Sequence, residues 1–177
     1  MPTQRYSNTS IVLHWLIAIL IVAAFALGTI MTDMKFSPTK LQYYSYHKWL
    51  GVTVFGFVAI RLLSRLFSKA PPYPANMGLW QTRIANATHL FLYVLMFGVP
   101  LSGYFYTLAA GYPVVYFGQF ELPVLMGPNP DIKESLKDLH EILTKVMLVM
   151  VLLHIAAALK HHFIDKDGLL LRMRPGR

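Results

Sequence analysis

Cysteine is absent from the 177-residue sequence, which excludes a disulfide framework, a zinc-thiolate site and an iron–sulfur cluster held by the chain's own thiolates. Charged residues are also few, at 14% of the chain, against about 25% in an average soluble domain. The signature motifs of serine hydrolases, P-loop NTPases and dinucleotide-binding enzymes are missing as well. Hydrolase and transferase activities therefore have no support, and any metal must bind to histidine, methionine or carboxylate side chains.

Hydrophobic residues make up 55% of the chain, and its mean hydropathy is +0.47. Four segments are long and apolar enough to cross a bilayer as helices, namely 9–31, 44–67, 84–108 and 136–163. Prolines in the connecting segments, Pro130 among them, mark these segments as loops. The first apolar run is longer than a signal-peptide core, so we expect an uncleaved span. We predict an all-α integral membrane four-helix bundle, formed as a single domain over residues 1–177.

Lysine and arginine are distributed unevenly between the two ends of this predicted bundle. At the end with both termini and the second connection, ten basic residues, Lys69 and Arg177 among them, minus two acidic residues give +8. At the other end, six basic residues are balanced by six acidic ones. Because cytoplasmic loops carry the excess of Lys and Arg, we predict that both termini are cytoplasmic. The net charge then reflects topology and anionic lipid headgroups, and nucleic acid is not an expected partner.

The fourth span carries histidines at positions 140 and 154. On a helix, His140 and His154 lie about 40° apart around the axis and about 21 Å apart along it. They therefore share one face, each near a different membrane boundary. An imidazole in hydrocarbon is costly and is normally tied to function or to a partner. This spacing suggests the hypothesis of two haems stacked one above the other.

Three histidines on the other predicted spans match these two by their depth in the membrane. His47 lies at the depth of His140, whereas His14 and His89 lie at the depth of His154. A six-coordinate b-type haem needs two axial imidazoles from facing helices, so we expect the fourth helix to supply one ligand to each haem. Spacing alone leaves open whether His14 or His89 partners His154.

Two alternatives to haem ligation are histidines that only hydrogen-bond at the membrane interface and a single zinc or copper site. Matched depths argue against interfacial histidines. The 14-residue separation of His140 and His154 argues against a single metal centre.

Several short motifs occur in a fixed order along nearly the whole chain. They are Ser10-Ile-Val-Leu-His14-Trp15, His47-Lys48-Trp49-Leu50-Gly51, Arg61-Leu-Leu-Ser-Arg65, the run of His89, Tyr93, Pro100 and Gly103, His140, the segment from His154 to His162, and the ending Leu171-Arg172-Met173-Arg174-Pro175. In this order they resemble the bacterial di-haem cytochrome b561 family, whose best-defined activity is superoxide oxidase.

The resemblance implies a multi-pass protein of the bacterial inner membrane with two haem b groups. By this resemblance His14 and His154 hold the cytoplasmic-side haem, and His47 and His140 hold the periplasmic-side haem. His89 is then not a ligand. The implied reaction oxidises superoxide to dioxygen and reduces ubiquinone.

Further residues are candidates for chemistry at the two ends. His161 lies seven residues after His154, about 20° around and about 10 Å along the same face, and we predict that it hydrogen-bonds to a quinone carbonyl and relays a proton. Lys48 and Lys137 are expected to pair with haem propionates or to attract a small anion, and superoxide is the anion that the resemblance implies. A solvated helix end balanced by acidic neighbours is the alternative for these lysines. Arg61 and Arg65 are expected to anchor the second span to the cytoplasmic headgroups, and a contact between Arg61 and a haem propionate is the alternative for Arg61.

Two rival functions belong to other classes of protein. The first is a non-catalytic electron-transfer subunit, similar to the cytochrome b partners of hydrogenases and formate dehydrogenases. The second is a haem-free membrane scaffold. Compact loops offer no obvious docking domain for a dehydrogenase, which favours the enzyme.

Overall fold

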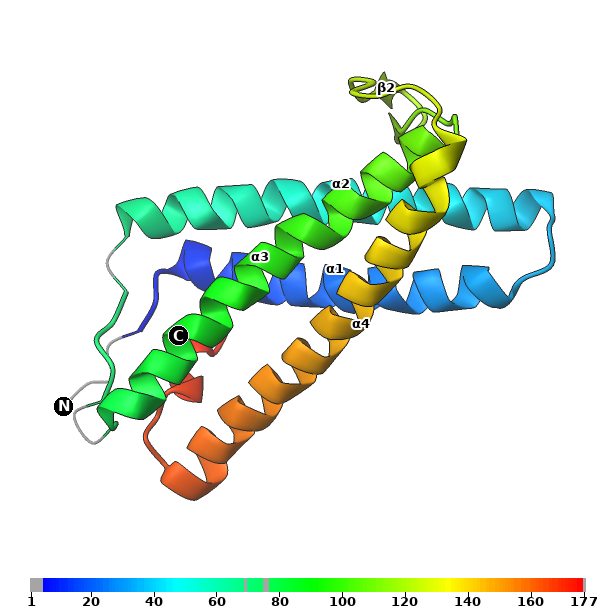
Figure 1. Ribbon diagram of the computed structural model, residues 1–177. Helices are drawn as coiled ribbons and strands as arrows, with labels where there is room; N and C mark the ends of the chain where they lie inside the picture. Colours follow the sequence, from blue (N-terminus) through cyan, green and yellow to red (C-terminus); the bar gives the residue numbers. More distant parts are fainter. Residues whose placement is uncertain (1–4, 69, 75–76, 177) are drawn as a thin grey trace.

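The computed structural model describes residues 5–68, 70–74 and 77–176, so Lys69 and Arg177 of the basic set lie outside the described residues. Four long helices dominate the fold (Figure 1): α1 (Asn8–Asp33), α2 (Pro38–Phe67), α3 (Leu79–Ala109) and α4 (Pro130–Lys160). α4 continues into a π-helix, η1 (His161–Asp165), and a 3-10 helix, η2 (Leu170–Met173), follows it. All four long helices are apolar enough to span a membrane, which confirms the predicted all-α integral membrane bundle.

The helices are longer than the predicted spans, chiefly because α2, α3 and α4 each begin five or six residues earlier. α2 begins at Pro38 after the capping side chain of Ser37, and α4 begins at Pro130 after that of Asn129. Proline fits the first helical turn because its missing N–H has no partner there and its φ is already helical. The prediction that Pro130 belongs to a loop is therefore wrong.

The four helices form two pairs that cross each other, α1 with α2 and α3 with α4 (Figure 1). One cluster of buried apolar side chains joins α1 to α2, and a second joins α3 to α4. Many other apolar side chains face outward, as lipid-facing residues do; Ile19 and Leu152 are 64% and 57% exposed. Among the described residues, neither buried cluster joins α1 to α4. The rings of His14 on α1 and His154 on α4 meet between these two helices.

A short hairpin covers one end of the bundle, which we call the hairpin end. Its strands, β1 (Val115–Tyr116) and β2 (Phe120–Glu121), pair antiparallel in the connection between α3 and α4, where the sequence predicted only loop. The Trp49 indole N–H donates to the Val115 carbonyl at 2.8 Å, and the hydroxyls of Thr53 and Tyr116 lie 2.9 Å apart. These bonds fix the hairpin to α2, two and six residues beyond His47.

The opposite end holds both chain termini, and we call it the termini end. Here the end of η2 and the residues after it lie against the start of α1 and the residues before it. The Trp15 indole N–H donates to the Met173 carbonyl at 2.7 Å, and the Arg5 guanidinium donates to the Arg174 and Gly176 carbonyls at 2.6 Å each. These contacts tie the beginning of the bundle to residues that follow all four helices.

Candidate functional site

His47 on α2 and His140 on α4 face each other near the hairpin end, with ring centroids 6.2 Å apart. The Nδ1 atom of His47 lies 3.0 Å from the Ala24 carbonyl, and that of His140 lies 3.0 Å from the Val99 carbonyl and 3.1 Å from Ser102 Oγ. A carbonyl can only accept, so the proton of each ring is on Nδ1. Each Nε2 lone pair is therefore available to a metal, the usual arrangement for a ligating histidine.

Glycine backbone lies against both of these rings. A Cβ on Gly103 of α3 would lie 2.9 Å from Cε1 of His140, and a Cβ on Gly28 of α1 would lie 3.1 Å from Cε1 of His47. Both distances are shorter than an ordinary contact of about 3.5 Å. Close approach of the neighbouring helix thus restricts each imidazole from the side, in addition to its hydrogen bonds.

Three histidines meet near the termini end. The ring centroid of His154 on α4 lies 6.2 Å from that of His14 on α1 and 5.6 Å from that of His89 on α3. Nδ1 of His89 is buried and has no hydrogen-bond partner within the described part of the chain. The structure brings both possible partners to His154, so the preference for His14 stays a prediction.

Arg61 of α2 lies beside this cluster and donates from Nη1 to the Ser10 carbonyl at 2.5 Å. Ser10 lies one turn before His14, so this bond connects α2 to the part of α1 that carries the candidate ligand. A half-buried guanidinium at this place is suited to a carboxylate such as a haem propionate. The predicted role of Arg61 stays a prediction.

The separations of the histidines fit a metal between paired imidazoles. Two imidazole nitrogens on opposite sides of one metal, each at about 2.0 Å, place the ring centroids roughly 6 Å apart. The pairs His47–His140 and His14–His154 both have a separation of 6.2 Å, and His89–His154, at 5.6 Å, is also close to this value. Residues suited to the two axial positions of a haem therefore lie near each end of the bundle, and α4 contributes one residue to each pair.

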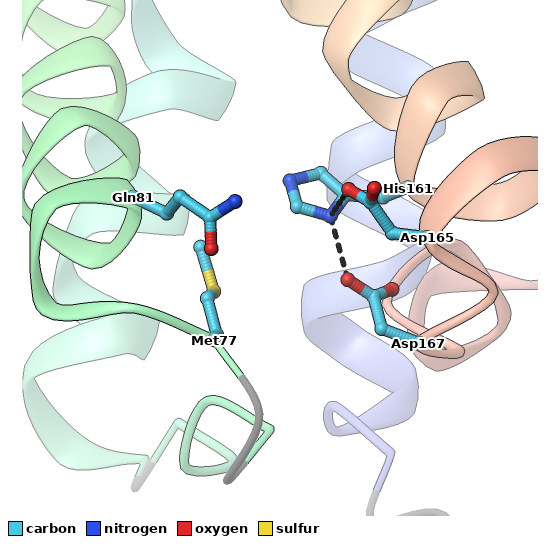
Figure 2. Close-up of a pocket in the computed structure, with 5 residues that line it drawn as sticks. All are labelled: Met77, Gln81, His161, Asp165 and Asp167. Atoms are coloured by element: carbon cyan, nitrogen blue, oxygen red, sulfur yellow. Dashed lines mark hydrogen bonds and ion pairs between the residues drawn. The ribbon is translucent and has the colours of Figure 1, made fainter.

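His161 begins η1 and contacts two carboxylates (Figure 2). Its Nδ1 lies 2.6 Å from Asp167 Oδ2 and 3.1 Å from Asp165 Oδ2, and the Asp167 side chain is only 4% exposed. Lys160 also binds Asp165, at 2.6 and 2.8 Å from its two oxygens. The imidazole and the two carboxylates lie close enough to hold a cation, but Lys160 already neutralises Asp165, so we interpret the group as a hydrogen-bonded network.

A cavity of about 210 Å³ lies beside this network, lined by Met77, Gln81, His161, Asp165 and Asp167 (Figure 2). Of these residues, His161 was predicted from the sequence, whereas Gln81, Asp165 and Asp167 were not. Lys166 and Gly168 have φ of 50° and 76°, so the backbone turns sharply on both sides of Asp167. The only signal in the sequence was the Asp167-Gly168 pair just after an apolar helix, a common turn composition.

The two candidate lysines at the hairpin end differ in their surroundings. Lys137 Nζ lies 3.6 Å from Glu134 Oε2, and the Lys137 side chain is 44% exposed. Both observations agree with the alternative of a solvated helix end balanced by acidic neighbours. Lys48 is half-buried next to His47, and the described residues provide it no ion pair. Lys48 is therefore the better candidate for an uncompensated positive charge.

These observations define a class of protein. Four membrane-spanning helices carry paired imidazoles near both ends, and a cavity with an imidazole–carboxylate pair lies at one end. This combination is typical of a membrane-embedded cytochrome.

Comparisons with known proteins identify the family. The family model of prokaryotic cytochrome b561 matches residues 5–176. Cytochrome b561 homolog 2 of Escherichia coli is 36% identical over 172 residues, which cover 96% of this chain and 91% of that protein. Cytochrome b561 homolog 1 of the same organism is 32% identical over 183 residues, covering 98% and 99%. A probable superoxide oxidase CybB of Yersinia pestis is 27% identical over 180 residues, covering 97% of both chains.

The chain therefore belongs to the prokaryotic cytochrome b561 family, which confirms the resemblance found in the sequence. It is a multi-pass membrane electron-transfer protein, and membership implies that it binds haem b. The paired histidines described above are the residues that fit this cofactor.

Proposed function

We propose that this chain is a di-haem cytochrome b of the bacterial inner membrane that oxidises superoxide at the hairpin end and reduces ubiquinone at the termini end. In this proposal His47 and His140 hold one haem, and His14 and His154 hold the other. The hairpin end faces the periplasm and the termini end faces the cytoplasm. The observation that carries the proposal is the equal 6.2 Å separation of two histidine pairs at opposite ends of the bundle.

The reaction balances as two superoxide ions plus ubiquinone plus two protons giving two dioxygen molecules plus ubiquinol. When bound, haem supplies one-electron carriers between the two ends. The chain's own residues must therefore attract an anion at the hairpin end, hold the quinone at the termini end and deliver protons there. The name of the Yersinia pestis relative, a probable superoxide oxidase that is 27% identical, supports superoxide as the electron donor.

Lys48 supplies the positive field at the hairpin end. It follows His47 directly and has no ion pair within the described residues, whereas Lys137 shares its charge with Glu134. An uncompensated cation beside an electron acceptor raises the local concentration of a small anion. Lys137 contributes less to this field because Glu134 lies 3.6 Å away.

His161 delivers protons at the termini end. It follows His154 by seven residues on the same helix and lines the cavity, so a quinone bound there is close to the second histidine pair. Asp167 accepts a hydrogen bond from the Nδ1–H of His161, which leaves Nε2 to exchange protons with the quinone oxygen. Arg61 neutralises a propionate of the cofactor nearby.

The first experiment measures the haem content of the purified protein, from a pyridine haemochrome and a reduced-minus-oxidised spectrum. Two haem b groups per chain are expected. The protein is then given superoxide, and reduction of ubiquinone-1 is followed optically. If the purified chain does not reduce ubiquinone but a co-purifying dehydrogenase supports the reduction, the chain is an electron-transfer subunit and the oxidase proposal is wrong.

A further inference from the structure

Gln81, near the start of α3, lies across the cavity from His161 (Figure 2). Its Oε1 accepts a hydrogen bond from the Gly78 backbone N–H at 3.0 Å. This bond fixes the orientation of the amide, because only the oxygen can accept from an N–H. The NH₂ group therefore points into the cavity, toward His161, as a donor held in place by the cap of its own helix.

The opposite wall is equally fixed. Asp167 Oδ2 accepts from His161 Nδ1 at 2.6 Å, while Asp167 Oδ1 accepts from the Leu169 backbone N–H at 3.0 Å. Left-handed backbone at Lys166 and Gly168 holds Asp167 in the turn beneath the ring. With Nδ1 engaged, Nε2 of His161 is the ring nitrogen on the Gln81 side of the cavity (Figure 2).

The cavity has the size of a head group. Its volume of about 210 Å³ is below the roughly 300 Å³ at which pockets for drug-sized ligands begin. One substituted six-membered ring fits this space, whereas a long apolar tail has to remain outside it. Two polar groups on opposite walls suit a ring with oxygens at opposite positions, which is the chemistry of a quinone.

We propose that Gln81 and the His161–Asp167 pair form a two-sided binding site for the quinone head group. The Gln81 NH₂ donates to one carbonyl oxygen and His161 Nε2 faces the other, while Asp167 is a positioning residue that acts through His161. This inference rests on the proposed function and adds to it the residue that binds the far side of the ring.

The proton steps follow from this placement. His161 with protons on both nitrogens donates from Nε2 to the adjacent quinone oxygen, and Asp167 stabilises the charged ring before the transfer. The neutral imidazole keeps its Nδ1 proton toward Asp167 and regains the Nε2 proton from water. The second oxygen takes its proton from water while it is bound by Gln81. Two electrons from two superoxide ions complete the reduction to the quinol.

Gln81→Glu tests the far wall. Glutamate has the same length and still accepts from Gly78 N–H, but it replaces the NH₂ donor with a second acceptor oxygen. We expect the KM for ubiquinone-1 to rise roughly 10-fold, with the haem content and the rate of haem reduction by superoxide unchanged. Gln119→Glu, an exposed glutamine of the hairpin, is the matched control and keeps the wild-type KM. If Gln81→Glu does not accumulate with haem, Gln81→Met is the second variant, with the same expected rise.

Asp167→Asn tests the positioning role. The asparagine keeps the shape of the side chain but no longer stabilises a charged imidazole. Asp165, 3.1 Å from the same ring nitrogen, compensates little because Lys160 already neutralises it. We expect kcat at saturating ubiquinone-1 to fall by about 10-fold or more, with a small change in KM. The pH profile of kcat should also change, which a purely structural role would not produce. Asp138→Asn, on an exposed aspartate of α4, is the matched control.

The outcomes separate this inference from the proposed function. A haem-loaded wild-type protein that fails to reduce ubiquinone-1 refutes both. A wild-type protein that reduces it, together with an unchanged KM in the Gln81 variants and an unchanged kcat and pH profile in Asp167→Asn, refutes the two-sided site alone.

Discussion

Replacing Gly103 with alanine is expected to displace the hairpin-end haem, because the Gly103 backbone lies against the His140 ring. The new Cβ would lie 2.9 Å from Cε1 and 3.1 Å from Nδ1 of His140. To restore an ordinary contact the ring must move by about 0.5 Å or more, which equals the roughly 0.5 Å tolerance of a preorganised site. This movement also strains the bonds from Nδ1 to Val99 and Ser102, each worth about 1 kcal/mol.

Two other glycines provide a graded comparison. A Cβ on Gly28 would lie 3.1 Å from Cε1 of His47, a slightly milder overlap, whereas a Cβ on Gly56 would meet nothing within 4 Å. Alanine is favoured over glycine inside a helix by about 1 kcal/mol, so Gly56→Ala should be neutral or stabilising. The expected order of damage is Gly103→Ala, then Gly28→Ala, with Gly56→Ala harmless.

The assay is the haem-to-protein ratio, followed by potentiometric titration of each variant. We expect about one haem per chain in Gly103→Ala and two in Gly56→Ala. A partial effect on the same haem, seen as a changed midpoint potential, is expected for Gly28→Ala. If Gly103→Ala binds two haems with unchanged midpoint potentials, the reasoning from ring contact to ligation is refuted.

Three further perturbations test other parts of the site. His14→Ala should lose one haem and His89→Ala should keep both, as measured by pyridine haemochrome; the reverse result would make His89 the ligand. Lys48→Gln should lower the rate of haem reduction by superoxide several-fold at low ionic strength and little at high ionic strength; Lys35→Gln, exposed at the same end, is the control, and an equal loss there contradicts a local effect. Trp49→Phe removes the bond to Val115 and should speed hydrogen exchange of the hairpin amides at unchanged haem content; unchanged exchange would show that the bond does not hold the hairpin.

The pairing of the histidines was predictable because a helix has a fixed rise and rotation per residue. Once four spans are assigned, the depth of each histidine follows from its position, and His47 with His140 is the only match near the hairpin end. At the termini end, the ambiguity over which histidine partners His154 also has a physical cause. His14 and His89 lie on helices that begin at the same membrane side, and the structure places both residues near His154.

The cavity at the termini end could not be predicted by the same reasoning. Its walls come from the first turn of α3 and from the turn after α4, where helical periodicity no longer applies. The predicted third span began at residue 84 and so excluded Gln81, just as the predicted second and fourth spans began six residues after Pro38 and Pro130. Asp167 reaches His161 only because a π-helix and two left-handed residues redirect the backbone.

The contacts between the start of α1 and the segment after η2 have a consequence for how the protein is assembled. Trp15 and Arg5 are synthesised first, but their partners, the carbonyls of Met173, Arg174 and Gly176, follow all four helices. These bonds can therefore form only after α4 has left the ribosome and entered the membrane. Because His154 lies on α4, the closing segment can reach the region around His14 only after the last helix of that histidine cluster is in place.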